Sequence, residues 1–407
     1  MATATQMSTK TIRDSVYGNV EVSGLFLELL HRPEMQRLHG IRQLGLTYLV
    51  YPGANHTRLE HSLGTCYVAR RMAAALSLPE KERQAVGVAA LLHDIGHGPF
   101  SHTLEYLLHL ATGKNHETIT RDMIVGTTTL ADVDMPETLP RVLEDHGIDP
   151  ADISAILAGE RGHLSDIIHG PVDADQIDFL RRDAHYTGVA YGVIDFDRLM
   201  QTLTLHDGRL AIAKKGVSAL ESMLVARALM YSSVYLHKTV RIAELMLVRA
   251  VERAPPFDFS QMTDGETIQA LKDMGPLQRD IALRLKYRQL FKRAYWRSLA
   301  TLSGEEKKHL AELDTKQAEN DIARRAGLDD GYVIVDVPGR DILLSEPRLR
   351  KMDLQVLEEG TLSPLSQHTP LTNALQLRGI TDWGIMVACP EDARDRVAEI
   401  APGVLWG

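Results

Sequence analysis

The sequence lacks cysteine pairs, long apolar runs and an excess of proline and glycine. Cys66 and Cys389 are the only cysteines, and they lie far apart with no pairing pattern and no metal-ligand spacing. This favours a reducing cytosol over a disulfide-stabilised fold. The 30 glycines and 17 prolines among 407 residues are too few for a disordered or fibrous chain. A globular protein is therefore expected.

Membrane segments and a basic balance are also missing. No stretch approaches the roughly 20 consecutive apolar residues that span a bilayer, and the first residues, MATATQMSTKTIRD, lack the apolar core of a signal peptide. The 54 acidic residues outnumber the 45 Lys and Arg, which leaves a formal net charge of −9. We expect a cytoplasmic protein that binds no membrane and does not coat nucleic acid, so an anionic ligand would need local basic residues.

Helical periodicity dominates what is present. Residues 62–76, SLGTCYVARRMAAAL, repeat apolar side chains at three- and four-residue steps, and later stretches do the same. Hydrophobic residues make up 44% of the chain, enough to build a core. The length exceeds that of one compact domain, so we predict a mainly α fold with a helical core over residues 1–255 and smaller units after it.

Three interruptions of the helical pattern define the expected organisation. TLTLHDGRLAIA alternates apolar and polar residues around an Asp-Gly turn at 207–208, which predicts a small β-hairpin insert. A Pro-Pro pair at 255–256 ends a long helix, and residues 256–330 are then predicted as a helical extension. YVIVDVP and WGIMVACP are typical of buried strands and CPEDARDRVAEIA of an amphipathic helix, so residues 331–407 should form a small α/β unit.

One run concentrates residues with chemistry. AVGVAALLHDIGHGPFSH ends an apolar helix in His93 and Asp94, adds His97 one helical turn later, and reaches His102 after a Gly-Pro break. A lone His-Asp dipeptide is most often a hydrogen-bonded pair at a helix end. The surrounding sequence has to decide whether it is more than that.

Two further motifs supply this context. HTRLEHSLG places His61 at the start of an apolar helix, and VDADQIDFLRRDA offers Asp175 in the first turn of another. With His93 and Asp94 they form an H…HD…D set, which suits a divalent Mn, Mg, Fe, Co, Ni or Zn ion and leaves room for water and a phosphate oxygen. Such an open site is catalytic rather than structural. The alternative is a buried ion-pair network, which would be costly without a metal.

The motifs HTRLEHSLG, HDIGHGPFSH, KNHETIT and VDADQIDFLRRDAHYTG resemble, in this order, those of HD-superfamily metal-dependent phosphohydrolases. The likeness is greatest to deoxynucleoside triphosphate triphosphohydrolases, both the human type with a sterile-alpha-motif and its prokaryotic relatives. It runs from about Arg13 to Trp296 and includes QRLHGIRQLG, YPGANHTRLEHS, LHKTVR and LKYRQLFKR. An HD-domain helical core is implied. The implied ligands of one divalent metal ion are His61, His93, Asp94 and Asp175.

The resemblance also implies catalytic residues beside the metal. His116 and Glu117 match the family's HE motif, in which the carboxylate orients the imidazole as general acid or base. His102, with Glu105 one turn later, is a second such pair, and His97 is a further candidate. These groups would protonate the leaving oxygen and position the attacking water, with the division of roles left open. Each could instead be a hydrogen-bonded structural histidine.

Substrate contacts follow from the same resemblance. The family's phosphate contacts fall on Arg58, Arg227 and Lys238. Tyr235, two turns after Arg227 on the same helix face, matches a base-stacking tyrosine, with core packing as the alternative. A surface role is the alternative for Arg227. Gln43 and Asp183 match contacts to the sugar hydroxyl, which discriminate because an unpaired buried polar group is penalised.

The chain departs from the family at four positions. Gln176 stands where many relatives have a phosphate-binding Lys, and Phe179 stands where they have a Tyr at the sugar. This weakens the case for deoxynucleoside triphosphates more than the case for phosphohydrolysis. His31 and His39 replace the Asp and Arg of the human-type guanine-nucleotide activator site.

Other nucleotide control stays open, because Arg288 and Lys292 in YRQLFKR match the family's basic allosteric contacts. Their alternative is a solvated basic helix face.

The predicted function is hydrolysis of (deoxy)nucleoside triphosphates to nucleoside and tripolyphosphate through a metal-activated water. One rival is an HD phosphatase or phosphodiesterase for smaller nucleotides, which Gln176 and Phe179 favour. The other is a non-catalytic nucleotide-binding regulator, against which the intact ligand set speaks. Relatives are usually oligomers, so a homo-oligomer is expected.

Overall fold

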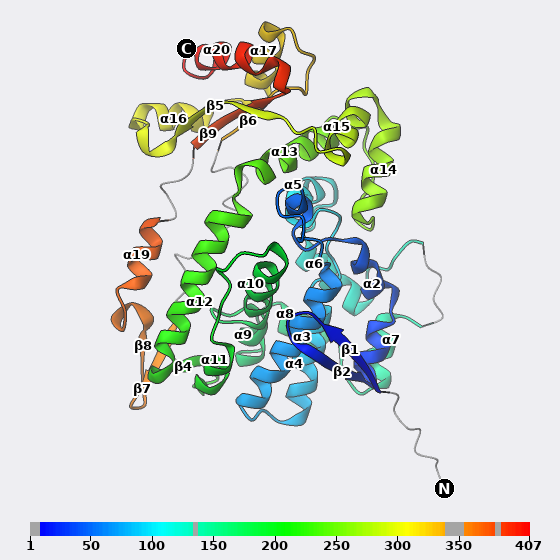
Figure 1. The fold of residues 1–407 in the computed structure, drawn as a ribbon. Coiled ribbons are helices and arrows are strands. Elements are labelled where there is room, and N and C mark those ends of the chain that lie inside the picture. The colour runs from blue at the N-terminus through cyan, green and yellow to red at the C-terminus, as the bar shows by residue number, and fades with distance from the viewer. Residues whose placement is uncertain (1–8, 133–136, 338–353, 379–383) are drawn as a thin grey trace.

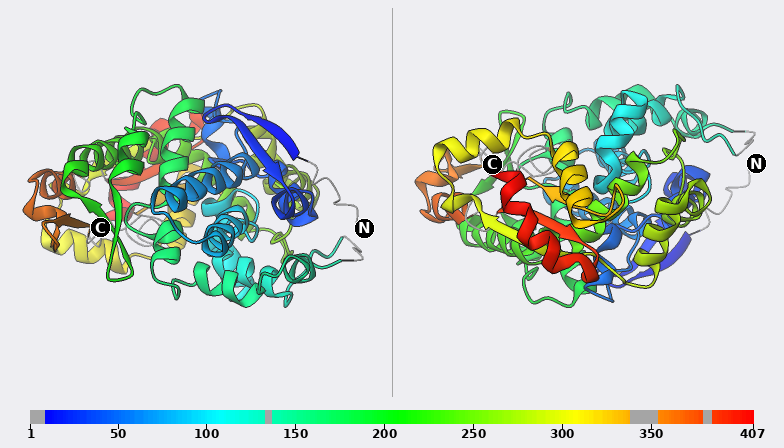
Figure 2. Two further views of the ribbon diagram at one scale, coloured as in Figure 1. Left: turned by 90° about the horizontal axis from the view of Figure 1, so that it is seen from below. Right: turned by 90° about the horizontal axis from the view of Figure 1, so that it is seen from above.

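The computed structural model describes residues 9–132, 137–337, 354–378 and 384–407. Helices make up most of these ranges (Figure 1), which confirms the mainly α class. No helix in the described ranges is both long and apolar enough to cross a membrane. The C-terminal helix and its neighbours lie at one end of the helical core, at the top of Figure 1 and toward the viewer in the right-hand view of Figure 2.

Three helices form the centre of the core. Helix α3 (Arg58–Ala75) packs against both α4 (Glu80–Leu92) and α10 (Ala174–Thr187). The approach of α10 depends on Gly64, because a Cβ there would lie only 1.9 Å from Asp178 Oδ1. This close contact places the first turns of α3 and α10 side by side. The other helices of the core are α1 (Leu25–Leu30), α2 (Pro33–Gln36), α5 (Ser101–Thr112), α6 (His116–Val125), α7 (Leu139–Asp145), α8 (Pro150–Leu157), α9 (His163–His169) and α11 (Phe196–Thr202).

The long helix expected before the Pro-Pro pair is interrupted. Helix α12 (Val217–Met230) runs into a π-helical turn at Tyr231–Tyr235, and α13 (Lys238–Glu252) starts anew. The His237 imidazole caps α13 by accepting a hydrogen bond from the Thr239 amide at 3.2 Å. Apolar periodicity could not reveal this break because both sides of it keep a buried face.

The hairpin predicted around 207–208 is confirmed. Strands β3 (Leu203–His206) and β4 (Arg209–Ala213) pair antiparallel, and both turn residues have a positive φ. Two strands from the C-terminal region, β7 (Gln355–Glu358) and β8 (Thr361–Pro364), extend it to a sheet of order β3-β4-β7-β8, and α19 (Leu371–Arg378) packs on α12. A second hairpin, which the sequence reading missed, joins β1 (Thr9–Asp14) to β2 (Gly18–Ser23).

Residues 331–407 contain the predicted strands and helix, but they do not form one unit as predicted, because β7, β8 and α19 pack on the helical core. β6 (Ile334–Asp336) and β9 (Gly384–Cys389) are buried strands, and α20 (Arg394–Leu405) is the amphipathic helix. Their sheet has the order β5-β9-β6, and its third strand, β5 (Lys292–Ser298), comes from the region predicted as a helical extension. That prediction was incomplete, because pairing with the buried β9 overrides the local polar pattern of β5. The helices of the extension are α14 (Asp264–Met274), α15 (Pro276–Lys286), α16 (Gly304–Glu312) and α17 (Thr315–Ala326).

A buried carboxyl group on α13 makes the stability of the core depend on pH. Burial raises the pKa of Glu244 from its ordinary 4.5 to about 7, against the lowering effects of Arg241 and a hydrogen bond with Thr103 on α5. The folded protein keeps a proton that the unfolded chain releases, so the free energy of unfolding falls as pH rises between these two values. The expected loss is roughly 3 kcal/mol.

Glu244→Gln cannot ionise and should remove this loss. The Tm of the variant should exceed that of the wild type at about pH 8 and match it at about pH 5, as measured by calorimetry. Glu312→Gln, at the exposed end of α16, serves as the control. An equal Tm difference for Glu244→Gln at both pH values would contradict the argument.

Candidate active site

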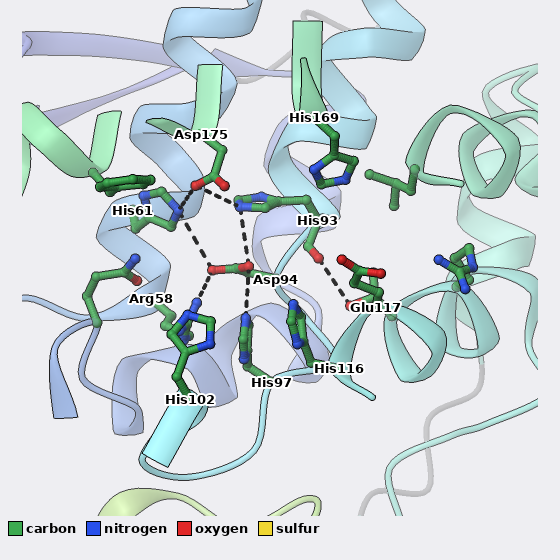
Figure 3. A pocket seen from close by; sticks show the side chains of 15 residues that line it. Arg58, His61, His93, Asp94, His97, His102, His116, Glu117, His169 and Asp175 are labelled. Carbon is green, nitrogen blue, oxygen red and sulfur yellow. Dashed lines mark hydrogen bonds and ion pairs between the residues drawn. The ribbon is translucent and has the colours of Figure 1, made fainter. Parts of the chain in front are cut away.

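Three helix ends bring the four expected metal ligands together (Figure 3). His61 lies in the first turn of α3, which begins at a capping box on Thr57. His93 ends α4 and Asp94 follows it, while Asp175 lies in the first turn of α10. His61, His93 and Asp94 are buried, and Asp175 is partly exposed. The site is therefore a buried cluster with one open side.

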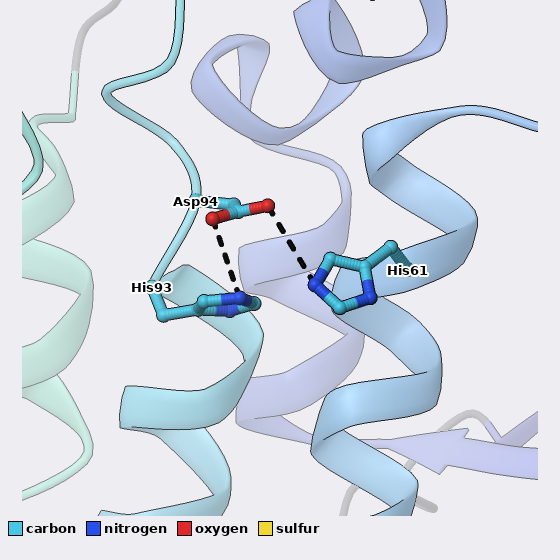
Figure 4. A group of neighbouring side chains, drawn as sticks. All are labelled: His61, His93 and Asp94. Carbon is cyan, nitrogen blue, oxygen red and sulfur yellow. Dashed lines mark ion pairs between the residues drawn. The ribbon is translucent and has the colours of Figure 1, made fainter. Parts of the chain in front are cut away.

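The distances within the cluster are short. His61, His93 and Asp94 offer ligand atoms that all lie within 4.8 Å of one another (Figure 4). His61 Nε2 lies 2.9 Å from Asp175 Oδ1 and 3.8 Å from Asp94 Oδ2. His93 Nε2 lies 3.3 Å from Asp94 Oδ1 and 3.9 Å from Asp175 Oδ1. His61, His93 and Asp94 thus face one point, and Asp175 Oδ1 borders this group beside the two imidazoles.

The outer nitrogens of both imidazoles are occupied, which leaves the inner ones for a ligand. His61 Nδ1 lies 2.8 Å from Asp178 Oδ2, and His93 Nδ1 donates to the Ala90 carbonyl at 2.8 Å. Such second contacts fix the tautomer of metal-binding histidines. His93 Nε2 is buried and has no hydrogen-bond partner, which is unfavourable unless something binds there. The donor set fits a first-row divalent ion.

The charges of the cluster also suit a cation. Burial alone would lower the pKa of His61, but Asp175 and Asp178 outweigh it and raise that pKa to about 10. Burial opposes ionisation of Asp94, yet Arg58, followed by His93 and His97, holds the pKa of this carboxyl well below its usual range. The carboxylate stays ionised, and His61 faces enough negative charge to hold either a proton or a metal ion at Nε2.

A second group of imidazoles lies beside the cluster and shares one carboxylate. The His97 and His116 rings stack with centroids 3.8 Å apart. His116 Nδ1 hydrogen-bonds to Glu105 Oε1, and the more exposed His102 lies with its Nδ1 3.2 Å from Glu105 Oε2. The expected pairing of His116 with Glu117 is therefore corrected to His116 with Glu105. Neighbouring residues of one helix point in different directions, whereas α5 presents Glu105 directly to α6.

This pairing sets the protonation of the group. Burial lowers the pKa of His116, but its hydrogen bond with Glu105 outweighs burial and raises it. Burial likewise raises the pKa of Glu105, and its bonds with His102 and His116 instead bring it far below the usual range. The ionised Glu105 carboxylate thus favours the protonated form of the His116 imidazole. Burial, with Arg58 and His116, keeps the pKa of His97 well below its ordinary value, so His97 is neutral.

Of the three residues expected to contact phosphate, one lines the pocket and two lie outside its lining. Arg58 is buried against the pocket, with Nη1 2.5 Å from Asp94 Oδ2, Nε 2.5 Å from Ser101 Oγ, and Nη2 without a partner. Arg227 does not line the pocket, because its Nη1 donates to Gln176 Oε1 at 2.8 Å. Lys238 is exposed at the start of α13 and lies outside the lining. Only Arg58 is in place.

Of the four residues expected near the nucleoside, two line the pocket and two do not. Gln43 and Phe179 line the pocket. Tyr235 and Asp183 stand behind this lining, because the Tyr235 hydroxyl donates to Asp183 Oδ2 at 2.6 Å and His56 Nε2 lies 2.7 Å from Asp183 Oδ1. The Phe179 and Tyr235 rings meet edge to face. Both groups expected to bind the nucleoside from this side are thus engaged with each other.

The candidate allosteric residues lie away from the pocket. Arg288 follows α15 with φ 56° and donates from Nε to the Leu49 carbonyl at 2.6 Å, and Lys292 begins β5. Their segment is a turn and a strand, so the alternative of a basic helix face is wrong. His31 and His39 are exposed.

Several site residues escaped the sequence reading. Asp178, one turn after Asp175, orients His61 and is itself held by Arg182 at 2.9 Å. Its spacing of three residues from Asp175 in DADQID could have predicted that both carboxylates lie on one face of the helix. His169 and Arg121 line the pocket from α9 and α6, and neither belongs to a recognisable motif.

Fold and site together define a helical protein with a histidine–aspartate cluster that could hold a divalent metal ion. The model of the HD domain matches residues 58–164, and that of the HD associated region matches residues 194–406. The chain belongs to the HD-domain phosphohydrolase family.

Similar proteins agree with this assignment. An uncharacterised Methanocaldococcus jannaschii protein, MJ1154, is 33% identical over 94% of this chain and 80% of its own length. A Dictyostelium discoideum homologue of the deoxynucleoside triphosphate triphosphohydrolase SAMHD1 is 30% identical over 62% of this chain, which spans about half (51%) of that relative. The structure of a Bacteroides thetaiotaomicron phosphohydrolase has a TM-score of 0.74 at 26% identity and covers 94% of this chain and all (100%) of its own.

Asp178→Asn should weaken metal binding without removing a direct ligand. The substitution takes the carboxylate from His61 Nδ1, so the imidazole loses its fixed tautomer, and affinity for Mn²⁺ should fall by about 10- to 100-fold. Calorimetric titration measures this. Asp197→Asn, which breaks an exposed ion pair with Arg71, is the control. An unchanged affinity in folded Asp178→Asn protein would show that Asp178 serves only Arg182.

Proposed function

We propose that this protein is a metal-dependent phosphohydrolase that converts (deoxy)nucleoside triphosphates to nucleoside and tripolyphosphate. The observation that carries the proposal is the open side of the His61–His93–Asp94 cluster, where the free Nη2 of Arg58 and the His116 imidazole meet the same pocket. When bound there, a divalent ion supplies positive charge for phosphoryl oxygens and acidifies water. His61, His93, Asp94 and Asp175 would hold it.

The protein's own residues account for substrate binding and proton transfer. Arg58 is positioned to bind a phosphate oxygen through Nη2, because its other nitrogens are fixed on Asp94 and Ser101. When water attacks the phosphorus nearest the nucleoside, the bond to the sugar oxygen breaks and that oxygen requires a proton. His116 holds one, and the Glu105 carboxylate stabilises the cation until transfer.

A smaller nucleotide is the second candidate substrate. Arg227 is turned to Gln176, and Lys238 is exposed outside the lining, so two of the three expected phosphate contacts do not face the pocket. A monophosphate or a phosphodiester would need fewer cations than a triphosphate.

The resemblance further supports a cytoplasmic homo-oligomer. A monomer in light scattering at micromolar concentration would contradict the oligomeric state.

Product analysis distinguishes the candidates. Metal-loaded protein is incubated with each deoxynucleoside triphosphate, with ribonucleotides and with nucleoside monophosphates, and the products are separated by anion exchange. Tripolyphosphate with free nucleoside would support the first substrate class, and orthophosphate or a monophosphate the second. No product with any divalent ion would favour a nucleotide-binding regulator. Asp94→Ala, with its fold checked by circular dichroism, is the inactive control.

The correction from Glu117 to Glu105 gives a kinetic prediction. Glu105→Gln should lower kcat by about 10²- to 10⁴-fold, because His116 loses the carboxylate that keeps it protonated. The alkaline limb of the pH–rate profile should also move to lower pH, since the pKa of His116 falls without Glu105. Glu117→Gln, a pocket residue not paired with His116, is the matched comparison. A larger loss in Glu117→Gln than in Glu105→Gln would restore the original pairing.

A further inference from the structure

The chain crosses the active site through an unusual turn between α4 and α5. Phe100 and Ser101, two consecutive non-glycine residues, have φ values of 50° and 32°, in the left-handed region that side chains disfavour. Ser101 Oγ accepts the hydrogen bond from Arg58 Nε, and α5, which begins here, carries His102 and Glu105. The conformation of this turn therefore sets the positions of a phosphate contact and of the proton-transfer group. Something must hold it.

The carboxylate of Asp264, from a distant part of the chain, holds this turn through a hydrogen bond. Asp264 is 2% exposed, and its Oδ1 accepts a hydrogen bond from the Phe100 amide at 2.8 Å. Its Oδ2 accepts from the Arg42 amide at 3.0 Å, with the Arg42 guanidinium 3.8 Å away. One buried side chain thus joins the turn to the segment that leads into the Gln43 edge of the pocket. Asp264 itself does not line the pocket.

The segment that carries Asp264 is fixed by further contacts to the same two regions. Arg37 donates to the Met262 carbonyl at 3.3 Å, and its Nη2 donates to the carbonyls of Ile95 and His97 at 2.9 and 2.7 Å. Gly40 packs on Thr263 so closely that a Cβ would lie 2.3 Å from Thr263 Cγ2. Residues 262–264, called the clasp below, therefore hold the loop after Asp94 in place.

Asp264 does not act as the N-cap of its own helix, so helix capping does not account for its buried position. Helix α14 is capped by Thr263, whose hydroxyl accepts from the Glu266 amide while the Glu266 carboxylate accepts from the Thr263 amide. Both oxygens of Asp264 serve other segments instead. A helix-capping role and a role in the active site can thus be separated by mutating different residues.

We propose that Asp264 is a positioning residue for catalysis, which holds the turn at 98–101 and, through it, Arg58, His102 and Glu105. The proposal rests on the proposed phosphohydrolase function. Asp264→Asn keeps one acceptor oxygen but sets an NH₂ group against one of the two backbone donors. None of the four expected metal ligands hydrogen-bonds to Asp264, and Asp94 is linked to the turn only through Arg58. Metal affinity should therefore fall by less than kcat, which is expected to fall by about 10- to 100-fold.

Glu266→Ala is the matched control, because it removes the capping box of α14 and leaves the turn intact. It should lower Tm like Asp264→Asn but keep kcat within about threefold. In Arg37→Lys, one nitrogen replaces the two guanidinium nitrogens that join the Met262 carbonyl to the Ile95 and His97 carbonyls. This variant should reproduce the kcat loss, and the double variant should lose less than the product of the two factors. Arg37→Lys also carries the test if Asp264→Asn does not fold.

Hydrogen–deuterium exchange separates this proposal from the proposed function. In Asp264→Asn, exchange of peptides covering 98–104 should rise at least about tenfold, whereas Glu266→Ala should affect only the start of α14. If the wild type hydrolyses no nucleotide, the proposed function fails and exchange still tests the clasp. Unchanged exchange at 98–104, or equal kcat in Asp264→Asn and Glu266→Ala, would overturn the role of Asp264.

Discussion

Burial of the Asp94 carboxylate is the constraint on which the rest of the site depends. A carboxylate that is 4% exposed must have its charge balanced on every side. Arg58 supplies the balancing charge from α3, while the His93 and His97 imidazoles face the carboxylate from the end of α4 and from the following loop. Three segments therefore have to meet at one point of the core.

The supporting residues lie behind the first layer and come from distant parts of the chain. Gly64 admits α10, which brings Asp178 to the outer nitrogen of His61. Arg37 and Asp264 hold the loop and turn that follow Asp94. An arrangement of this kind gives precise side-chain positions because each one is fixed through rigid helices rather than through a mobile loop. The same dependence means that a change far along the chain can reach the metal centre.

The His116 pair shows how packing can change the partner that a motif indicates. The sequence places Glu117 next to His116, yet the helix directs these side chains apart, and Glu105 reaches His116 from α5. The nucleoside side behaves similarly, because the π-helical turn that ends at Tyr235 brings its hydroxyl to Asp183. In both places a residue-type pattern identified the right neighbourhood, and helix geometry decided the partners.

Local periodicity and short motifs were sufficient to predict the helical class, the hairpin at 207–208, the C-terminal strands and the set of His61, His93, Asp94 and Asp175. Packing of distant segments settles the membership of β5 in the C-terminal sheet, the pairing of Glu105 with His116 and the contacts of Asp264. These features depend on contacts between segments that lie apart in the sequence, in one case by more than a hundred residues. No local sequence pattern predicts such contacts. A buried hydrogen bond is specified by where two backbones meet, and that is a property of the packed fold.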